Sequence, residues 1–143
     1  MLRIKYLLAN KSNTVWSIAP DEPVLHAIQL MSDKSIGALP VVDRDQQLIG
    51  SVSERDYARK VILKGRSSAE TPVSQIMATP VITVTPEHSV HDCMEMMTEK
   101  RIRHLPVIEK NQLIGMISIG DLVKAVIEEQ QQTITQLERY IAG

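Results

Sequence analysis

Hydrophobic residues follow the same order of patterns twice along this chain. A short apolar run occurs at 15–18 (VWSI) and again at 81–84 (VITV), and each run predicts a β-strand. Apolar side chains at helical spacing follow and predict an α-helix in each half. These side chains are Val24, Ile28 and Met31 in the first half and Val90, Met94 and Met97 in the second.

Two further apolar runs, separated by a polar turn, follow each helix and predict a β-hairpin. Their sequences are ALPVVD (38–43) and LIGSVS (48–53) in the first half, and HLPVIE (104–109) and LIGMIS (113–118) in the second. A helix that starts near Glu54 or Ile119 closes each half. The pattern therefore predicts an α+β fold made of two β-α-β-β-α units.

Proline and acidic residues predict where the first helix of each unit begins. Pro20 and Pro86 follow the first strands, and proline fits the first turn of a helix because the N–H that it lacks has no intrahelical partner there. Asp21, Glu22 and Glu87 come next, and carboxylates are favoured at the positive end of the helix dipole. We therefore expect both helices to start directly at these prolines.

The two halves are also repeats at the level of residue identity. Residues 20–43 align with 86–109 with eight of 24 positions identical. After one extra loop residue in the first copy, residues 47–56 align with 112–121 with six of ten identical. The chain is therefore a duplicated unit of roughly sixty residues.

Composition narrows the class of protein. The chain has 143 residues, 43% of them hydrophobic, which suits one compact domain or two small packed halves. A formal charge of −1 gives no general attraction to nucleic acid or to an anionic membrane. Cys93 is the single cysteine, and no run of apolar residues reaches the length of a membrane span. We expect a cytoplasmic protein with neither nucleic acid nor membrane as a partner.

One phrase, Gly-x-apolar-Ser-x-x-Asp, ends both hairpins, at 50–56 and at 115–121. Ser-x-x-Asp is a common capping box, in which the serine and the aspartate satisfy backbone N–H groups at the start of a helix. The same helix start offers N–H groups and a positive dipole to a phosphate. The two roles are compatible. The residues concerned are Ser53 with Asp56, and Ser118 with Asp121.

These motifs resemble those of the CBS domain, named after cystathionine β-synthase. The Leu-Pro-Val strand, the Leu-Ile-Gly strand and the Ser-x-x-Asp phrase occur in the family's order in both units, over residues 14–128. The chain resembles small stand-alone bacterial proteins made of one CBS pair. This resemblance implies two pseudo-symmetric units packed as a Bateman module with terminal helices. The predicted parts are CBS domain 1 (8–64), a connector (65–73), CBS domain 2 (74–128) and a C-terminal helical extension (129–143).

The resemblance also implies a regulatory module that binds an adenine nucleotide between the units and takes part in signal transduction. AMP is the first expectation, followed by ADP, ATP or NAD. Ribose hydroxyls would bind Asp56 and Asp121. Phosphate would bind Ser53, Arg55, Ser118, Arg103, His104 and Gly120. The adenine pocket would use Trp16, Ser17, Ile18, Ile82, Thr83, Val84, Leu105 and Pro106. Because Gly37 and Ala38 replace Arg103 and His104 in the first copy, we expect the two sites to differ in affinity or ligand.

Other classes of function have weaker support. His88, His91 and Cys93 lack a distant fourth ligand, so we expect no metal site, and Cys93 fits a small core residue. An enzyme would need a general base, and His104 alone fits that role, so we do not predict catalysis. The main alternative is a dimeric protein-interaction adaptor whose nucleotide clefts are vestigial.

The C-terminal region predicts a long helix from about Asp121 to Ile141. Its apolar line continues beyond the repeat and needs a surface to cover, either on the same chain or on a second subunit. The line consists of Ile127, Ile134, Leu137 and Ile141. The N-terminal IKYLLANK segment is a similar candidate. We expect a homodimer, since two-fold closure is the commonest arrangement of small homo-oligomers, and an effector protein that the sequence does not identify.

Overall fold

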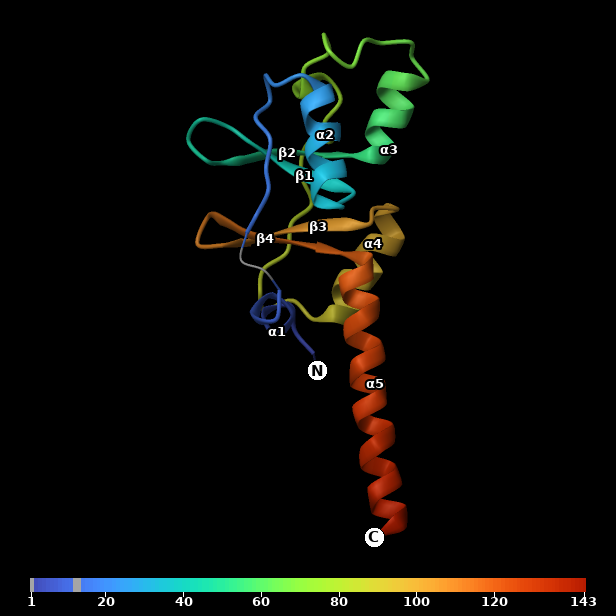
Figure 1. Cartoon of the computed structure of the whole chain (residues 1–143). Coiled ribbons are helices and arrows are strands. Elements are labelled where there is room, and N and C mark those ends of the chain that lie inside the picture. The colour runs from blue at the N-terminus through green and yellow to red at the C-terminus, as the bar shows by residue number, and fades with distance from the viewer. Residues whose placement is uncertain (1, 12–13) are drawn as a thin grey trace.

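The computed structural model describes residues 2–11 and 14–143, and it stacks the two predicted units one above the other (Figure 1). The first unit contains α2 (Val24–Lys34), β1 (Ala38–Val42), β2 (Leu48–Ser53), α3 (Glu54–Tyr57) and the π-helix η1 (Ala58–Ile62). The second contains α4 (Val90–Lys100), β3 (His104–Glu109), β4 (Gln112–Ser118) and α5 (Ile119–Ala142). The helix α1 (Ile4–Ala9) precedes the first unit, and the 3-10 helix η2 (Val73–Gln75) precedes the second.

Both predicted hairpins are confirmed, and their registers match. In each antiparallel pair the first residue of one strand lies opposite the last of the other, Ala38 opposite Ser53 and His104 opposite Ser118. Each hairpin also has a register shift at the same place, after Val41 and after Val107. The repeat in sequence is therefore a repeat in backbone geometry.

The first strand of each unit is shorter than predicted. Ile18 forms one parallel bridge to Val41, and Val84 forms one to Val107, while the rest of 15–18 and 81–84 is irregular. The bridging residues are buried in the cores and the residues before them are not. These segments therefore pair with the hairpins at a single point, and their other residues are half-buried or exposed.

The predicted helix starts at Pro20 and Pro86 are wrong. The helices begin later, at Val24 and Val90, after turns that contain these prolines. Asp21, Glu22 and Glu87 accordingly lie before the helices. Two of these carboxylates have local partners, since Glu22 contacts His26 and Glu87 accepts from Arg3 at 2.6 Å. In the second unit Ser89 caps the helix by accepting a hydrogen bond from the backbone N–H of Asp92 at 3.0 Å.

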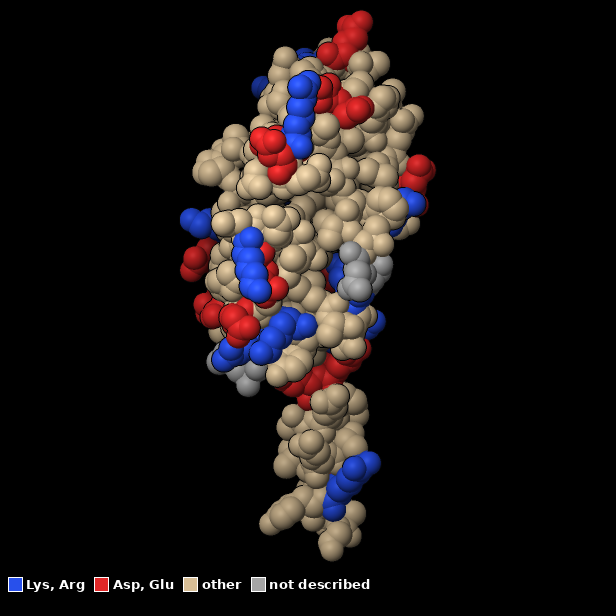
Figure 2. Space-filling view, turned by 90° about the vertical axis from the view of Figure 1, so that its left-hand side faces the viewer, with Lys and Arg blue, Asp and Glu red and all other residues tan. Residues whose placement is uncertain are grey.

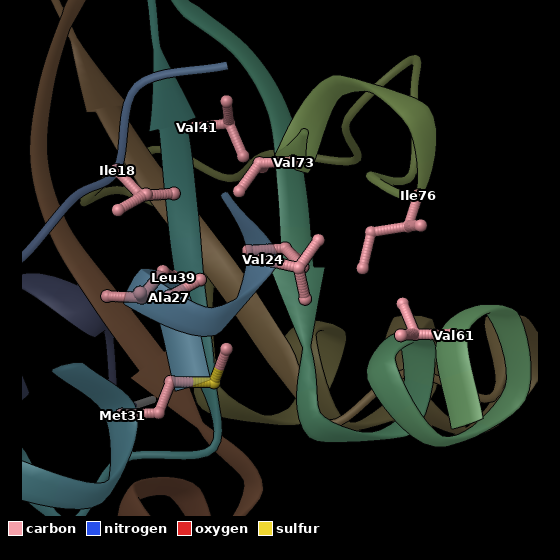
Figure 3. Packing of buried hydrophobic residues seen from close by; sticks show 10 residues of the cluster. Ile18, Val24, Ala27, Met31, Leu39, Val41, Val61, Val73 and Ile76 are labelled. Atoms are coloured by element: carbon pink, nitrogen blue, oxygen red, sulfur yellow. The ribbon is translucent and has the colours of Figure 1, made fainter. Parts of the chain in front are cut away.

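Each unit has its own aliphatic core. Figure 3 shows side chains of the first core, from α2, β1, η1 and η2, directed toward one another. The second core has the equivalent layers and contains Ile4, Val84, Val90, Cys93, Met97, Leu105, Val107, Ile117 and Leu122. Both cores of this chain, which has no phenylalanine, are therefore built without buried aromatic side chains.

The segments that precede the units are exchanged between them. Ile4 donates its backbone N–H to His88 in the second unit (2.9 Å), and Val73 donates to Glu22 in the first (2.9 Å). Both side chains are fully buried, each in the core that lies across the pseudo-two-fold axis. Gly115 makes room for this packing, because a Cβ there would lie 2.7 Å from Cδ2 of Leu8. The N-terminal segment therefore folds back on its own chain.

The last helix leaves the body of the molecule. Figure 1 shows the lower part of α5 extending well beyond the two units, with the C-terminus at its tip. On the face in Figure 2, acidic and basic side chains are interspersed over the body rather than collected in one field. In the residues that the structure describes, no helix combines the length and apolar character needed to cross a membrane.

Candidate ligand-binding clefts

The larger cleft between the units has a volume of about 540 Å³. Its walls come from both units, because residues 14–16 and 35–38 belong to the first repeat and 114–116 to the second. Ser118 and Asp121, from the second Ser-x-x-Asp phrase, lie at its edge. Leu8, Lys11, Pro40 and His104 complete the lining. A volume of this size is in the usual range for small-molecule sites.

The smaller cleft is the pseudo-symmetric counterpart and has a volume of about 160 Å³. It is lined by residues 80–82 and 101–104 of the second repeat together with Ser53 and Asp56 of the first. Each cleft therefore joins the first-strand segment of one unit to the Ser-x-x-Asp phrase of the other. The chain needs both repeats to build either site.

The difference in volume follows from two aligned positions. Ser35 and Gly37 line the larger cleft, and Arg101 and Arg103 occupy the equivalent places in the smaller one. A third aligned pair, Ala38 and His104, lines both clefts. The long arginine side chains take up space that remains open on the other side. Three cationic or titratable side chains therefore line the smaller cleft.

Both predicted capping boxes are confirmed. At the start of α5, the N–H of Asp121 donates to Oγ of Ser118 (3.1 Å) and the N–H of Ser118 donates to Oδ2 of Asp121 (2.9 Å). Ser53 and Asp56 make the same two bonds, at 3.1 and 2.9 Å respectively. Each aspartate thus uses Oδ2 for the helix cap.

The two aspartates differ in their second oxygen. Lys60 lies 3.2 Å from Oδ1 of Asp56, so both oxygens of that carboxylate have a partner. Lys11 binds Asp121 at Oδ2 (2.7 Å), the oxygen that already serves the cap. Oδ1 of Asp121 has no hydrogen-bonding partner within residues 2–11 and 14–143. As far as the described residues go, the larger cleft therefore presents a charged acceptor with one oxygen that has no partner.

Lys11 is a site residue that sequence reasoning missed. Its ammonium also donates to the carbonyl of Met116 at 2.7 Å, which fixes it at the edge of the larger cleft. Burial alone would raise the pKa of Asp121, but the hydrogen bonds from Lys11 and from the backbone N–H of Ser118 lower it below its ordinary value. Asp121 therefore stays ionised at neutral pH.

His104 lies between the two clefts and lines both of them. A Cβ on Gly37 would be 3.3 Å from its Cε1, so the absence of a side chain at Gly37 makes room for the ring. Burial lowers the pKa of His104, the charges of Lys11 and Arg103 lower it further, and Asp121 opposes them. The imidazole is therefore held in its neutral form more strongly than in the unfolded chain.

This shift predicts a loss of stability in mild acid. Because the folded state binds fewer protons than the unfolded state between the lowered pKa and the ordinary value of 6.5, the contribution of His104 is complete above pH 6.5 and decreases as the pH falls through this window. We expect the free energy of unfolding in urea to decrease from pH 7 toward pH 5, and His104→Gln to flatten that decrease. If the free energy of unfolding of His104→Gln decreases as the pH falls just as it does in the wild type, His104 is not the cause of that decrease.

The other predicted phosphate-site residues fall in different places. Arg55, Arg103 and His104 line one pocket of about 260 Å³ next to the smaller cleft, and Ser53 borders both. Arg55 donates there to the carbonyl of Arg101 at 3.2 Å. Gly120 lies in the first turn of α5 and lines none of these three cavities.

The predicted adenine-pocket residues divide between cleft and core. Trp16 lines the larger cleft and Ile82 the smaller one. The Lys34 ammonium lies 4.1 Å from the centroid of the Trp16 ring. The remaining predicted residues line neither cleft, and four of them are buried. Those four are Ile18, Val84, Leu105 and Pro106, and the others are Ser17 and Thr83.

The sequence prediction did not include several residues that line the clefts, although the alignment of the two repeats points to them. Val15 aligns with Val81, and Ile36 aligns with Ile102, and each pair occupies equivalent places in the two clefts. The alignment could have identified them as lining residues. Lys11 lies before the repeated part of the sequence, so the alignment had no signal for it.

The histidine and cysteine residues of α4 and the turn before it do not assemble into a metal site. Within the described part of the chain, no group of three His, Cys, Asp or Glu residues could hold a metal ion. His91 instead contacts Glu95 at 3.2 Å. Cys93 is buried in the second core, and burial together with the charge of Asp92 raises the pKa of its thiol to about 11. This thiol is therefore protonated at neutral pH.

Comparison with solved structures supports the tandem fold. A proposed signal-transduction protein with CBS domains from Burkholderia ambifaria MC40-6 is 49% identical, covers 90% of this chain and 96% of that one, and has a TM-score of 0.86. A hexameric CBS-CP12 protein from bloom-forming cyanobacteria is 31% identical, covers 86% and 70% of the two chains, and has a TM-score of 0.77. The pairing of two units in a Bateman module is thereby confirmed.

Sequence comparison supports the same family. The mitochondrial CBS domain-containing protein CBSX3 of Arabidopsis thaliana is 46% identical over 127 residues, which are 86% of this chain and 62% of that protein. This chain therefore spans less than two thirds of that relative's length. The family model for the CBS domain matches residues 11–63 and 73–128. Because both halves match, the chain belongs to the CBS-domain family, whose tandem pairs are in general regulatory, ligand-binding modules.

Proposed function

We propose that this protein is a sensor that binds an adenine nucleotide in the larger cleft, with AMP as the first expectation and ADP, ATP or NAD as alternatives. The observation that carries the proposal is Asp121 at the edge of a cavity of about 540 Å³, with an Oδ1 that has no hydrogen-bonding partner among the described residues. A carboxylate with one open oxygen can accept hydrogen bonds from ribose hydroxyls. CBS domains generally bind adenosyl ligands, which favours this class of ligand.

The other groups of the larger cleft fit the remaining parts of a nucleotide. Val15, Trp16 and Pro40 provide apolar surface for the adenine ring. The first turn of α5 offers a positive dipole end for phosphate, beside the ammonium of Lys11. A phosphate near His104 would raise the pKa of its imidazole, because a nearby negative charge favours the protonated form.

The smaller cleft would take a different ligand or bind the same ligand with a different affinity. Arg101 and Arg103 reduce its volume, and together with His104 they line it with cationic and titratable side chains. The carboxylate of Asp56 already has Lys60 as a partner. A small anion, such as the phosphate part of a nucleotide, fits these groups better than a whole adenosine does.

Ligand binding would regulate a partner only if the nucleotide prefers one of two arrangements of the units or of the oligomer. We infer a homodimer that signals to an effector protein, and we assign no catalytic step to the chain. The hexameric cyanobacterial relative is an example of an assembled CBS protein. A cytoplasmic location stays a prediction, since the Arabidopsis relative is named as mitochondrial.

Thermal unfolding tests the proposal directly. A ligand at about a hundred times its dissociation constant adds about 2.7 kcal/mol to the stability of the folded state. Since a chain of this size gains about 3 °C per kcal/mol, we expect AMP to raise the melting temperature by roughly 8–10 °C. ADP, ATP, NAD and S-adenosylmethionine complete the panel, and GMP with inorganic phosphate serves as the control.

The outcome also decides between the sensor and the adaptor. A shift with an adenine nucleotide that exceeds the shift with GMP supports sensing. If no ligand shifts the melting temperature, the two Ser-x-x-Asp phrases act as helix caps alone, and the adaptor becomes the better description.

A further inference from the structure

The lower part of α5 carries an exposed apolar line. Ile127 is 59% exposed, Ile134 47%, and Leu137 56%, although all three belong to a single helix of 24 residues. Val123 and Ile141 extend the line at its two ends. An isolated apolar residue at a surface is ordinary, but a continuous ridge of this kind marks an interaction surface.

The spacing of these residues is that of a coiled coil. Their positions alternate by four and three residues over the whole exposed length, which corresponds to the a and d positions of successive heptads. We call this set the α5 seam. It consists of Val123, Ile127, Gln130, Ile134, Leu137 and Ile141, in which Gln130 is the single polar residue.

The rest of the chain does not cover the α5 seam. A groove of about 490 Å³ separates α5 from α1, and α5 lines it with Lys124, Ala125, Glu128 and Gln132, among others. At 100° per residue Ala125, Glu128 and Gln132 lie across the helix from the seam, and Lys124 lies at its flank. In the described part of the molecule, five of the six seam residues are exposed large hydrophobic side chains.

We propose that the α5 seam pairs with the α5 seam of a second copy of this chain in an antiparallel two-stranded coiled coil. Such a pair places Ile127 opposite Leu137 of the second copy and Val123 opposite Ile141. Ile134 then faces Gln130 of the second copy near the centre, and the other apolar side chains of the seam meet one another.

Charge complementarity favours the antiparallel direction. Lys124 and Glu138 both occupy the position after a d residue, which flanks the seam. In the antiparallel pair Lys124 faces Glu138 of the second copy, and the two-fold axis repeats this contact. In a parallel pair the same two residues lie about 21 Å apart along the axis and cannot meet. The antiparallel pair also keeps the two bodies at opposite ends of the joined helices.

The first experiment measures mass by sedimentation of the full-length protein. We expect the wild type to have twice the mass of the variant with Ile134→Glu and Leu137→Glu, at concentrations between about 1 and 100 µM. The control variant carries Gln132→Glu and Gln136→Glu, which add the same charge on the opposite face, and it should keep the wild-type mass. Circular dichroism checks that both variants keep their helices.

Two results would overturn the proposal. A monomeric wild type would exclude both this pairing and the homodimer of the proposed function. A dimer that survives Ile134→Glu with Leu137→Glu would keep the homodimer and exclude the α5 seam. Nucleotide binding is measured separately, so neither result is confused with failure of the proposed ligand.

Cysteine cross-linking tests the direction. We expect Ile127→Cys mixed with Leu137→Cys to form a disulfide-linked dimer under mild oxidation, and neither variant to do so alone. If each cross-links with itself, the helices are parallel and the antiparallel assignment is wrong. The wild type is the control, because Cys93 is buried and its thiol has a raised pKa.

Discussion

Replacing Asp121 with Asn is expected to weaken AMP binding by about a hundredfold or more, because hydrogen bonds to a charged acceptor contribute about 1.5–3 kcal/mol each and ribose offers two hydroxyl donors. The variant keeps the size of the side chain. It also keeps an oxygen that can accept from the N–H of Ser118, so the start of α5 stays capped. Isothermal titration calorimetry with AMP measures the affinity and the number of sites.

Asp56→Asn is the matched control, since it makes the same change at the pseudo-symmetric position. Both oxygens of Asp56 already have partners, and its cleft is the smaller one. We therefore expect this variant to keep the affinity of the main site within about threefold. If Asp56→Asn removes AMP binding and Asp121→Asn does not, the nucleotide occupies the other cleft.

Local sequence patterns were sufficient to predict the hairpins and the capping boxes. The pairing of Ala38 with Ser53 depends on residues close together in the chain, where strand alternation and a polar turn fix the register. Ser53 and Asp56 are separated by one helical turn, so their bonds also follow from local spacing. These parts of the fold need little information from distant residues.

The exchange of the leading segments could not be predicted in the same way. Ile4 and Val73 each pack in the core of the unit across the pseudo-two-fold axis, and both lie in short helices with little periodicity of their own. The N–H of Val73 bonds to Glu22, about fifty positions away in the chain. Contacts of this range depend on how the units pack, and no local pattern encodes them.

The clefts could be predicted only in part, because they also depend on how the two units pack. The repeat identified Asp56 and Asp121 as equivalent, and the structure places them in equivalent clefts. The positions of Arg103 and Gly37 were singled out because they differ between the copies. Only the packing of the two units assigns Gly37 to the cleft of Asp121 and Arg103 to the cleft of Asp56. Lys11, outside the repeat, enters the site through the exchange of the N-terminal segment.

Truncating Ile4 to Ala should lower the free energy of unfolding by about 2–5 kcal/mol, although the residue lies in a helix of six residues near the N-terminus. Its side chain is fully buried in the second core, so the change leaves a cavity in that core. The backbone bond from Ile4 to His88 is kept, which makes lost packing the main cause. Urea unfolding measures the change.

Tyr6→Ala is the control on the same helix, because Tyr6 is 53% exposed and its truncation should cost less than about 1 kcal/mol. Ile4→Ala should also weaken AMP binding, since α1 places Leu8 and leads directly to Lys11 in the larger cleft. A small effect of Ile4→Ala on stability would mean that α1 does not belong to the second core in solution. In that case Lys11 would not be held beside Asp121, and the pKa of this carboxylate would rise because its hydrogen bond from Lys11 is lost.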